Sequence, residues 1–166
     1  LFVLIVLCQV GNLSFDAVDS AFDVGLPPLI LSAEFTLRAA LDLTVAAALL
    51  HLACLWPIRL PGASAWAGAG WAAAACSLGA AVLLNQRWWS TQIASTLLTV
   101  GSLGLFVWSM RLEPRPLTMA MLRVAALFAG LWIGLTVALG ATSGHPWWQA
   151  QVAAAGSTAC YLLLPT

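Results

Sequence analysis

Residues 29–56 read LILSAEFTLRAALDLTVAAALLHLACLW, and this stretch decides the fold. A helix of about 20 apolar residues crosses the hydrocarbon core of a bilayer, and this run is longer than that. It nevertheless contains Glu34, Arg38 and Asp42, each four residues after the last. A charge at membrane depth costs about 2.5–3.5 kcal/mol. These side chains must therefore pair with one another or face a protein or water interior.

The composition extends this conclusion to the whole chain. Of its 166 residues, 62% are hydrophobic and only 7% are charged. A water-soluble surface cannot be assembled from so few charged residues, which predicts an integral membrane protein. Lysine is absent, so the clustered basic surface of a nucleic-acid-binding protein is missing. The expected partners are the lipid bilayer and other membrane subunits, and not nucleic acid.

The pattern of apolar segments predicts an all-α fold, a polytopic transmembrane bundle of about six helices. Proline, glycine and polar residues separate the segments. We interpret residues 1–166 as a single transmembrane domain, whose first helix could be the remnant of a longer one because Leu1 already lies in an apolar run. The expected spans are Leu1–Leu13, Leu29–Trp56, Ser64–Leu84, Thr91–Met110, Leu117–Ala141 and Trp147–Leu164.

The arginines predict the orientation of the bundle. If the loop of residues 57–63 faces the cytoplasm, Arg87 alone lies on the other side, as the positive-inside rule expects. This arrangement favours a multi-pass protein of a cell inner membrane. The inner side would then hold Arg59, Arg111, Arg115 and Arg123 with a tryptophan belt of Trp56, Trp66 and Trp108, and the outer side would hold Asp16, Asp19 and Asp23.

The ionisable residues of the second segment are expected to form one polar stripe. Because successive residues turn by about 100°, a spacing of four drifts by only about 40°, and Arg38 can bridge both carboxylates. One interpretation is a satisfied ion triad that fixes the helix register. The other is an ion or proton path, in which Arg38 sets the protonation of Asp42.

Sulfur and imidazole ligands indicate a second candidate site. His51 lies about 180° around the helix from Asp42 and one turn before Cys54. Thioether and thiolate ligands with an imidazole suit Cu(I), so copper is the expected metal. The alternative is that these residues are ordinary apolar side chains at helix ends. The candidate metal ligands are His51, Cys54, Met110, Met119, Met121 and Cys160.

Catalytic motifs are missing from the sequence. It has no HExxH pattern, no phosphate-binding glycine loop and no Ser/His/Asp set, and only two histidines occur in the whole chain. We therefore expect that the protein is not an enzyme.

The stretch from Val10 to Leu50, with Leu31-Ser32-Ala33-Glu34-Phe35-Thr36-Leu37-Arg38-Ala39-Ala40-Leu41 at its centre, resembles the CopD family of copper-resistance membrane proteins. In that family a stretch of the type S/T-x-F-G-x-x-W-x-x-R-x-x-L leads into an apolar helix, and Arg38 matches its arginine. The family's histidines are replaced here by Leu84, Asn85 and their neighbours, and its Gly-Gly pair becomes Gly101-Ser102-Leu103-Gly104. The resemblance implies a membrane bundle that handles copper.

These observations predict an integral membrane transport protein for copper or another metal ion. Glu34, Arg38 and Asp42 would line its path. The alternative is a non-catalytic bundle, either an accessory subunit of a larger membrane complex or the membrane sensor domain of a longer chain.

Overall fold

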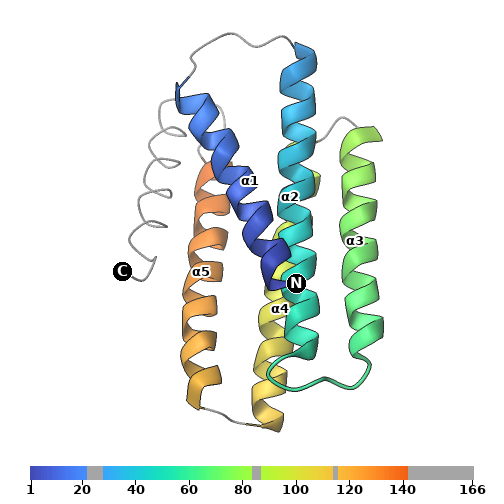
Figure 1. Ribbon diagram of the computed structural model, residues 1–166, viewed down its shortest axis with the longest axis vertical. Coiled ribbons are helices and arrows are strands. Elements are labelled where there is room, and N and C mark those ends of the chain that lie inside the picture. The colour runs from blue at the N-terminus through green and yellow to red at the C-terminus, as the bar shows by residue number, and fades with distance from the viewer. Residues whose placement is uncertain (22–27, 84–86, 114–115, 142–166) are drawn as a thin grey trace. The chain divides into compact units, whose positions relative to one another are not determined.

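The computed structural model describes the backbone of residues 1–21, 28–83, 87–113 and 116–141 (Figure 1). Within these ranges the chain is all-helical and contains no strand, which confirms the predicted class for this part of the protein. The predicted sixth span, Trp147–Leu164, lies outside the described residues, so the count of about six stays a prediction. The helices are α1 (Phe2–Ala21), α2 (Pro28–Leu55), α3 (Ala63–Leu83), α4 (Arg87–Leu112) and α5 (Pro116–Ala141).

Three helices of the described part are long and apolar enough to cross a membrane. The candidate spans are Ser32–Leu55 in α2, Ala63–Leu83 in α3 and Ser90–Leu112 in α4. The chain divides into two compact units, residues 1–122 and 123–166. The first unit holds α1 to α4, and the predicted polar stripe belongs to it. The single-domain interpretation stays a prediction.

The helix boundaries follow the apolar segments, with one exception. Pro28 and Pro116 begin α2 and α5, where the fixed φ of proline suits the first turn and its missing N–H is not needed. In contrast, α1 continues past the predicted end at Leu13 to Ala21, so Asp16 and Asp19 lie on helical backbone. Hydropathy marks the apolar part of a helix, and a helix can extend beyond that part.

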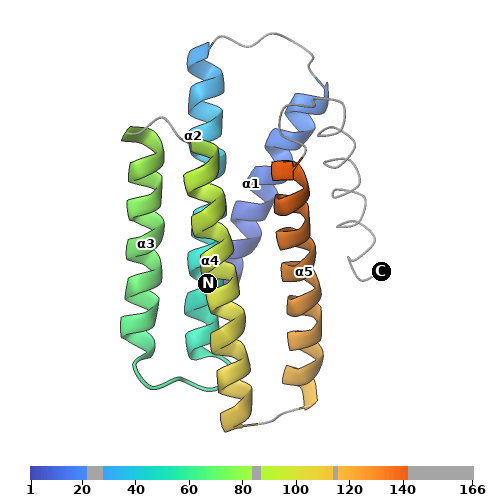
Figure 2. The same cartoon turned by 180° about the vertical axis from the view of Figure 1, so that it is seen from behind.

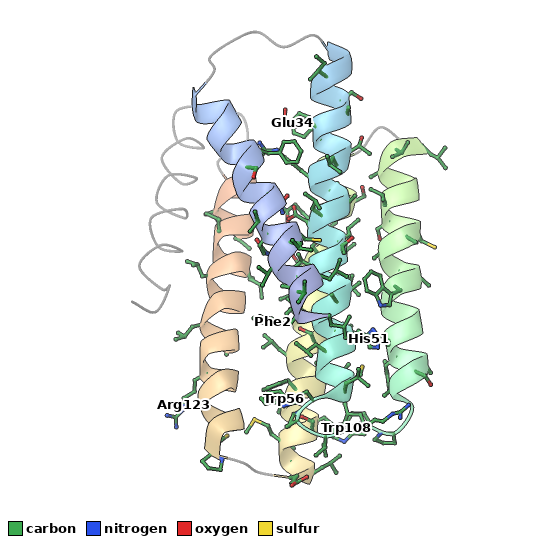
Figure 3. All side chains as sticks on the ribbon, viewed as in Figure 1. Phe2, Glu34, His51, Trp56, Trp108 and Arg123 are labelled. Atoms are coloured by element: carbon green, nitrogen blue, oxygen red, sulfur yellow. The ribbon has the colours of Figure 1, made fainter. Side chains whose placement is uncertain are left out.

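Helix α2 is the centre of the first unit. It packs against α1, α3 and α4, and α3 also packs against α4. Figures 1 and 2 show that α2 and α4 run in the same direction, while α1 and α3 run the opposite way. The ends of α2 and α4 and the start of α3 therefore lie together. Trp56 and Trp108 lie at this end (Figure 3), where Arg59 and Arg111 are exposed. That this end faces the inner side of a membrane stays a prediction.

Small residues let the three central helices approach closely. A Cβ added at Gly70 of α3 would lie 2.9 Å from Cδ2 of Leu50, and one at Gly101 of α4 would lie 3.5 Å from Cδ1 of the same leucine. Since lipid tails are as apolar as leucine, such close packing is what holds helices together in a bilayer. The buried cluster comprises Leu43, Ala46, Ala47, Leu50, Ala53, Cys54, Leu60, Ala63, Ala74, Leu98 and Leu105.

The loop between α2 and α3 is tied back to the bundle. The backbone N–H of Leu60 donates to the carbonyl of Cys54 at 2.9 Å, and the Leu60 side chain is buried in the cluster. Gly62, with φ of 73°, adopts the left-handed conformation that precedes α3. Its carbonyl accepts from the N–H groups of Ala65 and Trp66 in the first turn of α3. This short connection fixes the antiparallel pairing of α2 and α3.

Candidate functional site

The first part of the polar stripe is an ion pair within α2. Both Nε and Nη2 of Arg38 lie 2.8 Å from Oε1 of Glu34, and the side chains are 23% and 14% exposed, respectively. The guanidinium carbon of Arg38 also lies 5.4 Å from the ring centroid of Phe15 on α1. A cation over an aromatic face is attracted by the ring quadrupole. The pair is therefore covered by α1 on one side.

The second part of the stripe joins α2 to α1 directly. Nδ2 of Asn12 donates to Oδ1 of Asp42 at 2.7 Å, a distance typical of a hydrogen bond to a charged acceptor. The residue beside it, Gly11, has no side chain, and a Cβ there would lie 3.0 Å from Cδ1 of Leu41. Helix α1 thus approaches α2 closely where the hydrogen bond forms.

The stripe lies where the four-residue spacing predicts it, on the face of α2 that meets α1. Figure 3 shows Glu34 toward the start of α2 and His51 toward its other end. The neighbouring hydroxyl groups bond within their own helix: Thr36 donates to the carbonyl of Ser32 at 2.8 Å, and Thr44 to that of Ala40 at 2.6 Å. These hydroxyls are satisfied locally, as is common for threonine in helices.

Two residues of this contact, Asn12 and Phe15, were not expected from the sequence. Periodicity on one helix identifies a polar face but does not identify its partner. One signal was present, because Gly11-Asn12 interrupts an otherwise apolar segment. A polar residue inside an apolar span, next to a glycine, is typical of a helix contact.

His51 lies on the opposite side of α2 and contacts α3. Nε1 of Trp71 donates to Nδ1 of His51 at 3.3 Å. Because Nδ1 accepts this hydrogen bond, the proton of the neutral ring is assigned to Nε2, and neither nitrogen then presents a free lone pair. A metal ion could bind His51 only if this hydrogen bond is broken.

The other predicted metal ligands lie in different surroundings. Cys54 is fully buried in the apolar cluster, Met110 is buried on α4, and Met119 is 46% exposed. The side chain of Met121 and the whole of Cys160 lie outside the described residues. Among the described residues, no group of three or more His, Cys, Asp or Glu side chains could hold a metal ion. The copper site stays a prediction.

Replacing Trp71 with phenylalanine tests the contact between α2 and α3. The change removes the donor to His51, and one lost hydrogen bond is expected to lower the free energy of unfolding by about 0.5–1.5 kcal/mol. Trp66→Phe on the same helix is the matched control, because Trp66 is 49% exposed. Unfolding in mixed micelles measures both variants, and equal losses would contradict a specific role of the hydrogen bond.

Helix α4 presents a row of small hydroxyl residues to the bundle. Thr91, Ser95, Ser102 and Ser109 are all buried. The hydroxyl of Ser102 donates to the carbonyl of Thr99 at 2.7 Å, and that of Ser109 to the carbonyl of Phe106 at 2.9 Å. Small residues permit close packing in lipid, and the hydroxyls of Ser102 and Ser109 are satisfied within the helix. We assign this row to packing.

Comparisons with known protein families, with characterised proteins and with solved structures find no match to this chain. The resemblance to the CopD family therefore stays a prediction that rests on the residues around Arg38.

Proposed function

We propose that this chain is a multi-pass protein of a cell inner membrane that moves a small ion across the bilayer along the stripe of Glu34, Arg38 and Asp42. One observation carries the proposal. A helix long enough to span a membrane bears three ionisable side chains, and Asn12 and Phe15 of α1 contact two of them. Ionisable groups that face a helix contact inside a membrane are typical of ion and proton paths.

The depth of Asp42 supports a role in the path. Asp42 lies ten residues after Ser32, the first residue of the span, which corresponds to about 15 Å along the helix at 1.5 Å per residue. The hydrocarbon core is about 30 Å thick, so Asp42 would lie near its middle. An ion that crosses the bilayer needs a ligand at this depth, and the Asp42 carboxylate supplies one.

The chemistry of the stripe favours a hard ion as its cargo. Its possible ligands are the carboxylate oxygens of Glu34 and Asp42, with the amide oxygen of Asn12 beside them, and oxygen ligands suit hard cations. Cu(I) instead prefers sulfur and imidazole. The resemblance to the CopD family favours copper instead. We keep copper as the second cargo, with His51, Cys54 and Met110 as the described residues that would handle it.

Asp42→Asn tests the proposed function. The protein is reconstituted into liposomes, and the uptake of protons, Na⁺ and Cu⁺ is measured in separate arms. Wild type is expected to carry at least one of these ions, and the variant to carry it at least about tenfold more slowly, because a charged ligand for the ion is lost. Thr44→Val is the control, since the hydroxyl of Thr44 bonds to the carbonyl of Ala40 within its own helix. Equal rates in wild type and the Asp42 variant would overturn the proposal.

A specific observation favours an accessory subunit as the second candidate function. Nothing lies within 4 Å of a Cβ built at Gly68 or Gly79 of α3. The alanines at positions 65, 69, 72 and 73 are exposed on the same helix. Small residues on a membrane helix permit the close approach of another helix. A native mass above that of one chain, in gently extracted membranes, would support a subunit, and a lone chain would count against it.

A further inference from the structure

In the side-chain amide of Asn12, the nitrogen has a hydrogen-bond partner and the oxygen has none. Its Nδ2 donates to Asp42, but its Oδ1 is shielded from solvent and has no hydrogen-bond partner. A buried acceptor without a partner costs about 1–3 kcal/mol. Nearly all buried polar groups in folded proteins have partners, so an exception calls for an explanation.

Rotating the amide by 180° does not remove the problem. It would bring Oδ1 of Asn12 against Oδ1 of Asp42, and an ionised carboxylate is an acceptor only. The hydrogen bond to Asp42 therefore fixes the orientation of the amide. What the free oxygen lacks is a donor or a cation.

The charges of Glu34, Arg38 and Asp42 indicate which charge a partner of Asn12 Oδ1 should carry. Glu34 and Asp42 are acidic and Arg38 is basic, so these three groups together carry one net negative charge when ionised. One monovalent cation would neutralise them, whereas a divalent cation would leave an excess positive charge at membrane depth. Net charge inside a bilayer is costly, which favours the monovalent ion.

We propose that Oδ1 of Asn12 and the carboxylate of Asp42 together hold one hard monovalent cation. It is either Na⁺ bound to both groups, or a proton that bonds to the carboxylate and is donated in a hydrogen bond to Oδ1 of Asn12. Oδ1 and Nδ2 of Asn12 are bonded to the same carbon, and Nδ2 lies 2.7 Å from Asp42. A cation at Oδ1 is therefore within reach of the carboxylate. This inference rests on the proposed function and deepens it, because it names the class of the transported ion and a ligand from a second helix.

Asn12→Leu and Asn12→Asp test the inference in opposite directions. Ion uptake into liposomes is measured in two arms, a proton arm in sodium-free medium and a Na⁺ arm at fixed pH. For the ion that is carried, Asn12→Leu is expected to raise the half-saturating concentration about tenfold, with the maximal rate changed by less than about twofold. Asn12→Asp retains an oxygen ligand and adds a charge, so it is expected to lower that concentration. Gln9→Leu, at an exposed position of α1, is the control.

A binding measurement separates this inference from the proposed function. Na⁺ that binds the folded protein raises its unfolding temperature in detergent, because only the folded state contains the site. If Na⁺ stabilises wild type but not Asn12→Leu and no ion is carried, the site stands and transport is overturned. If Asp42→Asn slows uptake while both Asn12 variants match wild type, the inference is overturned and transport stands. Loss of saturable uptake in both Asn12 variants also overturns the inference, because Asn12→Asp retains an oxygen ligand and should still bind the ion.

Discussion

Replacing Glu34 with leucine is expected to lower the free energy of unfolding by about 3 kcal/mol. The change removes the carboxylate that both Nε and Nη2 of Arg38 contact at 2.8 Å. Removing one partner of a buried ion pair costs about 3–5 kcal/mol of stability. Placing an arginine at the centre of a bilayer costs about 2.5–3.5 kcal/mol. Arg38 lies six residues after Ser32, about 9 Å along the helix, and the pair is only part-buried, so the lower part of these ranges applies. Reversible unfolding in mixed micelles measures the change.

The double variant Glu34→Leu/Arg38→Leu distinguishes an ion pair from two independent contacts. Because the double variant also removes the cation that lost its Glu34 carboxylate, it is expected to recover at least about half of the stability that Glu34→Leu loses. Thr36→Val is the control on the same helix, since its hydroxyl bonds to the carbonyl of Ser32. A double variant no more stable than Glu34→Leu would contradict the pairing.

Replacing Gly70 with leucine is expected to destabilise the bundle by about 2–3 kcal/mol. Even the first added carbon would lie 2.9 Å from Cδ2 of Leu50, and the rest of the new side chain has to enter the same contact. Overpacking of this kind costs about 1–3 kcal/mol, and a whole leucine side chain places the effect near the upper end. The same unfolding assay in mixed micelles measures it.

Gly68→Leu is the matched control for the Gly70 variant. It adds the same atoms to the same helix, where nothing lies within 4 Å of the new Cβ. It is expected to change stability by less than about 0.5 kcal/mol. Adding Leu50→Ala to Gly70→Leu makes room for the new side chain and should restore part of the loss. Equal losses at Gly68 and Gly70 would mean that α3 does not pack on α2 at this point.

The helices that carry the site could be predicted from the sequence because apolar length marks membrane spans directly. The expected Leu29–Trp56 and Ser64–Leu84 differ from α2 and α3 by one residue at each end. The end of α1 was predicted too early, since Asp16 and Asp19 ended the apolar run but did not end the helix. The four-residue spacing also placed Glu34, Arg38 and Asp42 on one face.

The partners of those residues could not be predicted, because pairing between helices depends on register and on close approach. Asn12 meets Asp42 because Gly11 lets α1 come near Leu41, and a hydropathy pattern contains no such information. In the same way, the sequence predicts His51 as a metal ligand but gives no sign that Trp71 of α3 donates a hydrogen bond to its Nδ1. The transport role, the absence of catalysis and the cargo remain predictions.

The polar stripe of α2 faces α1 inside the protein, and both the ion path and the cation site depend on this contact. Cross-linking of cysteines at positions 12 and 42 tests it most directly, in a chain whose four native cysteines are replaced by alanine. We expect the pair Asn12→Cys and Asp42→Cys to link rapidly in native membranes. Val10→Cys with Asp42→Cys should not link, because Val10 is 53% exposed on α1. Failure of the 12–42 pair to link, or equal linking of both pairs, would contradict the contact.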